Sequence, residues 1–88
     1  MITAEEIRKS MRISHTGLDE EIRRNMNTCL LDMERVGVKT DTENTLIDKA
    51  CEFYCKSQFD YQGKGDAYRK NYENLRDAMS LTEGYRNV

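Results

Sequence analysis

The most apolar segment of the chain lies between Leu46 and Phe59, where its apolar side chains fill a wide arc of a helix. At about 100° per residue the arc covers roughly 200°. Its members are Leu46, Ile47, Ala50, Cys51, Phe53, Tyr54 and Cys55. One neighbouring helix cannot cover so wide a surface. The segment is therefore predicted to be the central helix of an all-α bundle, packed against at least two other helices.

Two segments on either side show narrower helical patterns. Residues 18–36 repeat apolar side chains at helical spacing, namely Leu18, Ile22, Met26, Cys29, Leu30, Met33 and Val36. Gly37 follows where a C′ glycine ends a helix. Residues 67–80 carry a seam of Tyr68, Tyr72, Leu75 and Met79. Asp66 is predicted to cap this last helix.

A short helix is predicted within residues 1–14. It opens on a capping box formed by Thr3 and Glu6. A second box, Thr40 with Glu43, precedes the central helix, and Thr42 competes as its N-cap. The link between the second and third helices is about five residues long, which makes these two helices an antiparallel hairpin.

The predicted fold is thus a small all-α bundle of about four helices. The long hairpin forms its centre, and short N-terminal and C-terminal helices flank it. Residues 1–80 form the bundle domain. Residues 81–88 show no period and contain Gly84, so we expect an extended C-terminal tail with apolar side chains at Leu81, Tyr85 and Val88. A chain of 88 residues buries only a modest core.

Composition narrows the functional classes. The net charge is −2, which argues against a dedicated nucleic-acid binder. No apolar run is long enough to span a bilayer, and no signal-peptide pattern is present. Three cysteines, an odd number, favour free thiols in a reducing cytosol.

The cysteines are the first candidates for chemistry. Cys51 and Cys55 are one helical turn apart and could share a metal, with Cys29 and His15 completing a set of four. This spacing differs from that of a zinc knuckle. All three cysteines also lie on apolar helix faces, where free cysteine usually packs. We favour core packing over a metal site or a Cys–His nucleophile.

The remaining polar and aromatic residues give no catalytic pattern. The carboxylates lie on polar helix faces, where nothing raises a pKa for acid–base work. Glu73 and Asp77 could hold a divalent ion, but a solvated face is the simpler interpretation. Five tyrosines suggest base stacking, although seam spacing favours packing; they are Tyr54, Tyr61, Tyr68, Tyr72 and Tyr85. We predict no catalytic residue, no cofactor and no metal ligand.

Two surface features remain. Arg8, Lys9 and Arg12 form a small basic cluster, which is either a solvated face or a contact for phosphate or an acidic partner. Leu31 points away from the apolar face of its helix, among polar neighbours. A single exposed leucine is ordinary, and a subunit contact is the alternative.

The N-terminal pattern carries a family resemblance. It runs from Met1-Ile2-Thr3-Ala4-Glu5-Glu6-Ile7-Arg8-Lys9 through Met11-Arg12-Ile13-Ser14-His15 to Leu18-Asp19-Glu20-Glu21-Ile22. This pattern resembles that of head–tail connector (adaptor) proteins of tailed bacteriophages and prophages. In that family a short helix leads to an apolar-Arg-Ile-Asp motif, an acidic stretch and a long second helix. Here Arg12 and Ile13 match, whereas Ser14 replaces the aspartate and Gly17 with Leu18 replaces part of the acidic stretch. Chain length, helix count and the apolar third helix also fit.

The resemblance implies a structural virion protein, made in the bacterial host cytoplasm. Such proteins form a ring, commonly dodecameric, between the portal protein and the stopper or tail-completion protein. Isolated adaptors are often monomers. DNA passes through the ring without sequence-specific binding. Neither catalysis nor a cofactor is implied.

On this basis we predict two contact surfaces. Leu81, Tyr85, Arg86 and Val88 would dock on the portal. Leu31 and the edge formed by Arg8, Lys9 and Arg12 would contact neighbouring subunits. The alternatives are a small helical DNA-binding or regulatory protein of a phage or mobile element, with Arg23 and Arg24 added to the basic edge, and a thiol or metal protein that uses the three cysteines.

Overall fold

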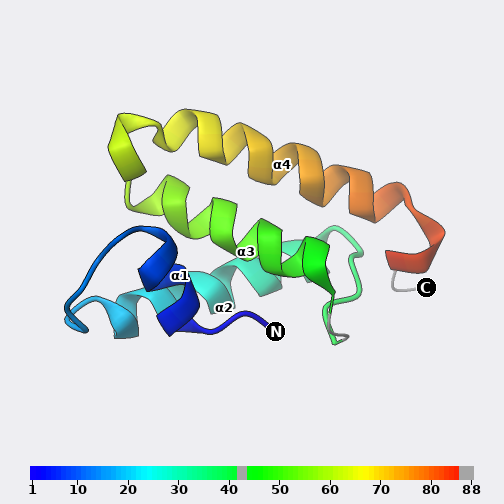
Figure 1. The fold of residues 1–88 in the computed structure, drawn as a ribbon. Coiled ribbons are helices and arrows are strands. Elements are labelled where there is room, and N and C mark those ends of the chain that lie inside the picture. Colours follow the sequence, from blue (N-terminus) through cyan, green and yellow to red (C-terminus); the bar gives the residue numbers. More distant parts are fainter. Residues whose placement is uncertain (42–43, 86–88) are drawn as a thin grey trace.

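The computed structural model describes residues 1–41 and 44–85. They form four α-helices and no β-strand (Figure 1). The helices are α1 (Ala4–Ser10), α2 (Asp19–Arg35), α3 (Thr45–Gln58) and α4 (Gly65–Leu81). Two 3-10 turns follow α3 and α4, namely η1 (Tyr61–Gly63) and η2 (Glu83–Tyr85). The predicted small all-α bundle of four helices is confirmed.

Helix α3 lies between α2 and α4 and packs against both (Figure 1). The three helices run in alternating directions, so α2 and α3 form the predicted antiparallel hairpin. Helix α1 packs against α2. The segment before α1 also reaches α3, where the Ile2 amide donates to Asp48 Oδ1 at 2.8 Å. The prediction that the most apolar segment forms the central helix is therefore confirmed.

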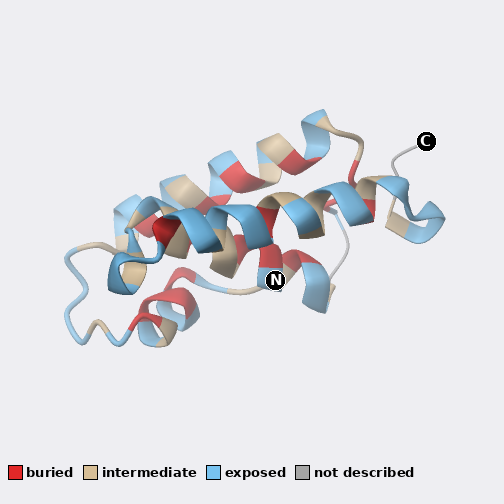
Figure 2. Cartoon of the chain, turned by 90° about the horizontal axis from the view of Figure 1, so that it is seen from above, coloured by how far each residue is buried: buried red, intermediate tan, exposed pale blue. Residues whose placement is uncertain are grey.

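The core gathers side chains from all four helices, and the outward faces are exposed (Figure 2). Its fully buried members include Ile7, Ile22, Cys29, Met33, Val38, Ile47, Cys51, Cys55 and Met79. The buried sector of α3 is narrower than predicted. Leu46, near one edge of the predicted arc, is 38% exposed, whereas Cys55 at the other edge is fully buried. The contact surface of α3 is thus centred on its cysteine side.

The start of α1 and the end of α2 follow the sequence signals. Thr3 Oγ1 accepts from the Glu6 amide at 3.1 Å, and the Thr3 amide donates back to Glu6 Oε1 at 3.2 Å. This is the predicted capping box. After α2, Gly37 adopts a left-handed φ of 91°. The Val38 amide then donates to the Met33 carbonyl at 2.9 Å, which completes a Schellman motif.

The predicted N-cap of α3 is wrong. Asn44 caps the helix, because its Oδ1 accepts from the Leu46 amide at 2.7 Å. Thr40 is buried within the link and donates its hydroxyl to Glu34 Oε1 at 2.6 Å. It is therefore tied to α2 and not to α3. The competing candidate Thr42 and the box partner Glu43 lie outside the described residues.

The predicted N-cap of α4 is also wrong. Helix α4 begins at Gly65, so Asp66 lies inside its first turn. The carboxylate that binds the free amide comes from the preceding loop, where Asp60 Oδ1 accepts from the Gly65 amide at 2.8 Å. Asp60 itself is in the left-handed region, at φ 48°. A β-carbon at position 65 would lie 2.7 Å from that oxygen and 3.0 Å from the Ser57 carbonyl oxygen. Only glycine fits this approach.

The first part of the C-terminal segment is not extended, contrary to our prediction. Leu81 is the last residue of α4, and Glu83–Tyr85 form a 3-10 turn. The Lys39 amide donates to the Tyr85 carbonyl at 2.6 Å, and the half-buried Tyr85 packs against the core. This contact with the link after α2 folds the segment back onto the bundle. Residues 86–88 lie outside the described residues.

Candidate partner-binding surfaces

The predicted portal strip is only partly an open surface. Leu81 is 81% exposed at the end of α4. Tyr85 is half-buried against the core and contributes less accessible area. The other two predicted residues, Arg86 and Val88, lie outside the described residues. Among the described residues of this strip, Leu81 therefore has the more exposed apolar side chain.

The predicted basic edge does not include Arg8. This residue is 8% exposed, and its Nε lies 3.0 Å from Asp19 Oδ1, although the two atoms are not aligned as a hydrogen bond. Its terminal nitrogen Nη1 donates to the carbonyls of Ile13 and Ser14 at 3.3 and 3.5 Å. Arg8 therefore holds the loop after α1 against the bundle and leaves little of its surface accessible to another chain.

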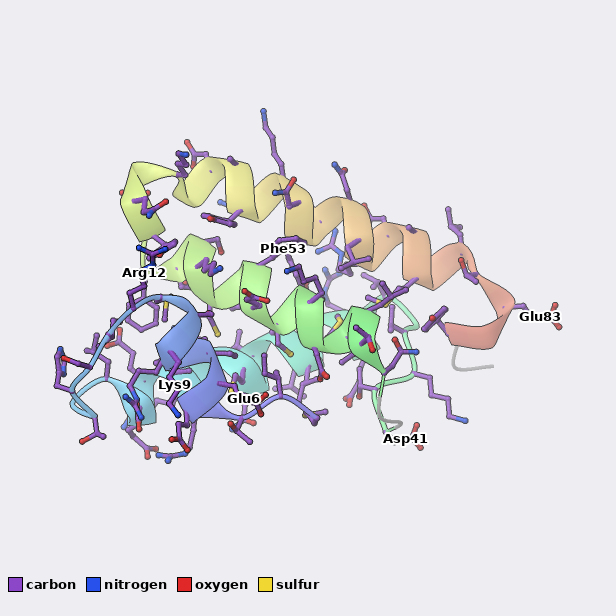
Figure 3. All side chains as sticks on the ribbon, in the orientation of Figure 1. Glu6, Lys9, Arg12, Asp41, Phe53 and Glu83 are labelled. Atoms are coloured by element: carbon purple, nitrogen blue, oxygen red, sulfur yellow. The ribbon has the colours of Figure 1, made fainter. Side chains whose placement is uncertain are left out.

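The other two residues of that edge are exposed. Lys9 projects outward from α1 (Figure 3) and pairs with Glu5 at 3.1 Å. Arg12 takes the left-handed position after α1, at φ 58°. The Ile13 amide donates to the Arg8 carbonyl at 3.2 Å, so this turn is a Schellman motif without glycine. The Arg12-Ile13 motif that carries the family resemblance thus builds the turn after α1.

Leu31 lies on the outer face of α2, where it is 66% exposed. The predicted orientation, away from the apolar face of the helix, is confirmed. Leu31 and Leu81 come from different helices, and each exposes a large apolar side chain. Both meet the requirement of accessibility for a contact with another chain, although most surface leucines have no partner.

The cysteines pack in the core, as predicted. All three are free and fully buried. Burial raises the pKa of the Cys55 thiol to about 12, which disfavours the thiolate that metals and electrophiles require. His15 is exposed, and its Nδ1 accepts from the Gly17 amide at 3.2 Å. Across residues 1–41 and 44–85, no three His, Cys, Asp or Glu residues are grouped to hold a metal ion.

The tyrosines of α3 and α4 form packing contacts, in agreement with the predicted seam. Tyr72 is buried, and its ring meets that of Tyr54 edge-on at 5.0 Å. On another side of α3, Tyr68 lies 6.3 Å from Phe53, which is placed between α3 and α4 (Figure 3). Lys56 Nζ lies over Tyr68, 5.5 Å from the ring centre. These rings are held against neighbours of the same chain.

A polar groove that sequence reasoning missed lies between α2, α3 and α4. Its volume is about 470 Å³. It is lined by Thr28, Asp32, Arg35, Tyr54, Ser57, Gln58, Arg69, Tyr72, Glu73 and Arg76. The lining residues come from three helices and are separated by up to almost fifty positions. No local motif links them, so the sequence held no signal for this groove.

Asp32 is the centre of the bonding network in this groove. Its Oδ2 accepts from the Tyr72 hydroxyl at 2.7 Å and from Arg76 at 2.9 Å, and its Oδ1 accepts from Arg35 at 2.8 Å. Partial burial alone would raise the pKa of the Asp32 carboxyl. The hydrogen bonds from these three residues outweigh burial and lower the pKa to about 2. Asp32 is therefore ionised at neutral pH and fixes two arginines along the groove.

Comparisons with known proteins returned no matching family model, no matching curated protein and no matching solved structure. Within the described part of the chain, no helix combines the length and hydrophobicity needed to cross a membrane. The function is therefore inferred from the N-terminal pattern and from the exposed surfaces.

Proposed function

We propose that this chain is a head–tail connector of a tailed bacteriophage or prophage. In this role it is a structural virion protein, one subunit of a ring that joins the portal protein to the stopper or tail-completion protein. The observation that carries the proposal is the N-terminal pattern from Met1 to Ile22, which resembles that of the connector family. DNA passes through such a ring without sequence-specific contacts.

The local structure of this pattern supports the proposal. The family pattern comprises a short helix, an apolar-Arg-Ile-Asp motif, an acidic stretch and a long second helix. Here the capped helix α1, the Schellman turn at Arg12 and the long helix α2 follow in that order. The replacement of the family aspartate by Ser14 leaves the turn intact, because backbone bonds and the Arg8 side chain hold it.

The exposed leucines support contacts with more than one neighbour. Leu81 at the end of α4 serves the portal, and Leu31 on α2, with Lys9 and Arg12, serves the adjoining copy. A ring of identical subunits uses two different surfaces on each copy, because its interfaces are head-to-tail and close by rotation. Separate apolar positions on α2 and α4 allow the ring contact and the portal contact to lie on different surfaces.

The DNA-binding alternative is less well supported. Arg8 of its basic edge is buried, and Arg23 pairs with Glu20 at 3.4 Å. The exposed residues that remain on this edge, Lys9, Arg12 and Arg24, are too few to neutralise a row of phosphates in a chain of net charge −2.

Portal binding tests the docking surface directly. We would co-express the chain with the portal protein of the same phage genome and measure co-elution by size-exclusion chromatography. Leu81→Asp is expected to weaken binding by about tenfold or more, because it places a charge in an apolar contact. Ala78→Asp, one turn earlier on the exposed side of the same helix, adds the same charge and is expected to bind as the wild type does. Equal co-elution of Leu81→Asp and wild type would remove Leu81 from the portal contact.

A further inference from the structure

The polar groove between α2, α3 and α4 continues toward the loop before α4. A second hollow of about 510 Å³ lies beside it and is lined by Ser57, Gln58, Asp60, Gly63, Gly65, Asp66 and Arg69. Ser57, Gln58 and Arg69 line both hollows. The two hollows are therefore parts of one groove, and Arg69 lies where they meet.

Three charged groups of the first hollow are already bonded within the chain, whereas Arg69 and Glu73 are not bonded to any described residue. Arg35 and Arg76 both pair with Asp32. Arg69 makes no hydrogen bond and no ion pair with any residue in the described ranges, and it is exposed. Two further donors of the lining, the Tyr54 hydroxyl and the side-chain amide of Gln58, likewise have no hydrogen bond within those ranges. Burial raises the pKa of Tyr54, so its hydroxyl stays protonated and can donate.

These free donors define the chemistry of a ligand. A guanidinium group binds a carboxylate through two parallel hydrogen bonds. A phenol and an amide beside it can donate to the same oxygens. The lining of the first hollow holds three arginines, Arg35, Arg69 and Arg76, against two carboxylates, Asp32 and Glu73, which leaves an excess of one positive charge in that hollow. Arg35 and Arg76 are fixed by Asp32, so the positive wall is ordered before a ligand arrives.

The carboxylates of the second hollow favour a protein ligand over a nucleic acid. Asp60 and Asp66 line it, and Glu73 lies in the first. A chain of phosphates along the groove would meet these carboxylates and be repelled. A peptide segment can instead present a single acidic side chain at Arg69 and neutral or basic residues beside it.

We propose that this groove binds a glutamate or aspartate side chain of a partner protein, with Arg69 as the principal contact and Tyr54 and Gln58 as additional hydrogen-bond donors. The inference rests on the proposed connector function and names the chemistry of one of its docking sites. Arg69 binds the carboxylate, and the Asp32 network keeps Arg35 and Arg76 in place around it.

Solution NMR of the full chain tests the groove. The ¹⁵N-labelled protein is titrated with a capped peptide Ala-Ala-Glu-Ala-Ala and, separately, with its glutamine analogue, inorganic phosphate and a short DNA duplex. We expect the glutamate peptide to shift the amide signals of Gln58, Arg69 and Tyr72, and the other three probes to leave them unchanged. Shifts elsewhere on the protein, or equal shifts with the glutamine peptide, phosphate or DNA, would overturn the proposal.

Charge-matched variants test the principal contact. Arg69→Glu is expected to raise the Kd of the glutamate peptide by about tenfold or more, because one charge-assisted contact is lost. Lys70→Glu makes the same charge change at the next residue of α4, which does not line the groove, and should leave the Kd within about twofold. Tyr54→Phe should raise it by about threefold. If Arg69→Glu binds the peptide as Lys70→Glu does, Arg69 is not the contact.

Portal co-elution of the same variants separates this proposal from the connector function. If Arg69→Glu loses both the peptide shifts and portal binding, the groove proposal and the connector function are both supported. Portal binding by the wild-type chain with no peptide shift overturns the groove proposal and leaves the connector function standing. Peptide shifts in a chain that never binds the portal retain the groove as a carboxylate site and overturn the connector function.

Discussion

Gly65 and Asp60 together determine how the chain enters α4. The Asp60 carboxylate binds the Gly65 amide, and the close approach of the Ser57 carbonyl leaves no room for a side chain at position 65. A glycine pair around Lys64 looks like a flexible turn in the sequence. One member of that pair, Gly65, in fact lies at a close approach of α3 and α4.

Gly65→Ala should therefore destabilise the fold by about 1–3 kcal/mol. The new methyl group meets a backbone carbonyl that cannot rotate away. Gly84→Ala is the control, because a β-carbon there meets nothing within 4 Å. Urea unfolding of the two variants and the wild type measures the free energies. A Gly65→Ala protein as stable as Gly84→Ala would contradict the close approach.

Asp32 makes the stability depend on pH. Its pKa falls from an ordinary value of 3.8 to about 2 in the folded chain. A carboxyl with a lowered folded-state pKa contributes stability that is fully present above its ordinary pKa. That stability is lost as the pH falls through the folded-state value.

Asp32→Asn should cost about 1–2 kcal/mol near neutral pH, with the difference from wild type shrinking between about pH 4 and pH 2. Unfolding curves collected along that pH range measure the difference. Glu73→Gln provides the control from the same groove, because Glu73 makes no ion pair within the described ranges. A constant difference between Asp32→Asn and wild type at all pH values would show that the charge of Asp32 does not stabilise the fold.

At the level of elements, helical spacing and glycine placement were enough to predict four helices, their order and the hairpin. The start of α1 and the end of α2 followed from local signals, the capping box at Thr3 and the glycine at position 37. The starts of α3 and α4 did not. Thr40 and Asn44 are both good caps by residue type, and only the bond from Thr40 to Glu34 shows which one is engaged elsewhere.

The burial of Arg8 illustrates a second limit of sequence reasoning. The helical pattern of α1 shows Ile7 as apolar and Arg8 as its charged neighbour, which indicates a solvated side chain. The loop after α1 folds back over Arg8, and Asp19 from the start of α2 reaches it. Both contacts depend on how α1 packs against α2, and that packing is not encoded in a local pattern.

The same reason explains which surfaces sequence could predict. Leu31 was recognisable because a single helix fixes its direction. The groove around Arg69 could not be predicted, because its walls come from α2, α3 and α4. Its binding chemistry depends on which arginines are bonded: Arg35 and Arg76 pair with Asp32, whereas Arg69 does not. An excess of unbonded donors is a property of the assembled bundle.

For the whole molecule, a small core and separate accessible surfaces on α2, on α4 and in the groove suit a subunit that is completed by its neighbours. A chain of 88 residues gains little stability from its own core. Contacts with copies of itself and with the portal would add buried area that the isolated subunit lacks. This expectation agrees with the role in assembly that we propose.

Negative-stain imaging of portal particles, with and without this chain, tests the connector assignment most directly. If the chain is a connector, class averages of the mixture will show an additional ring of density on the face of the portal that receives the tail. Portal particles that are identical in both samples, at an excess of the chain, would contradict it.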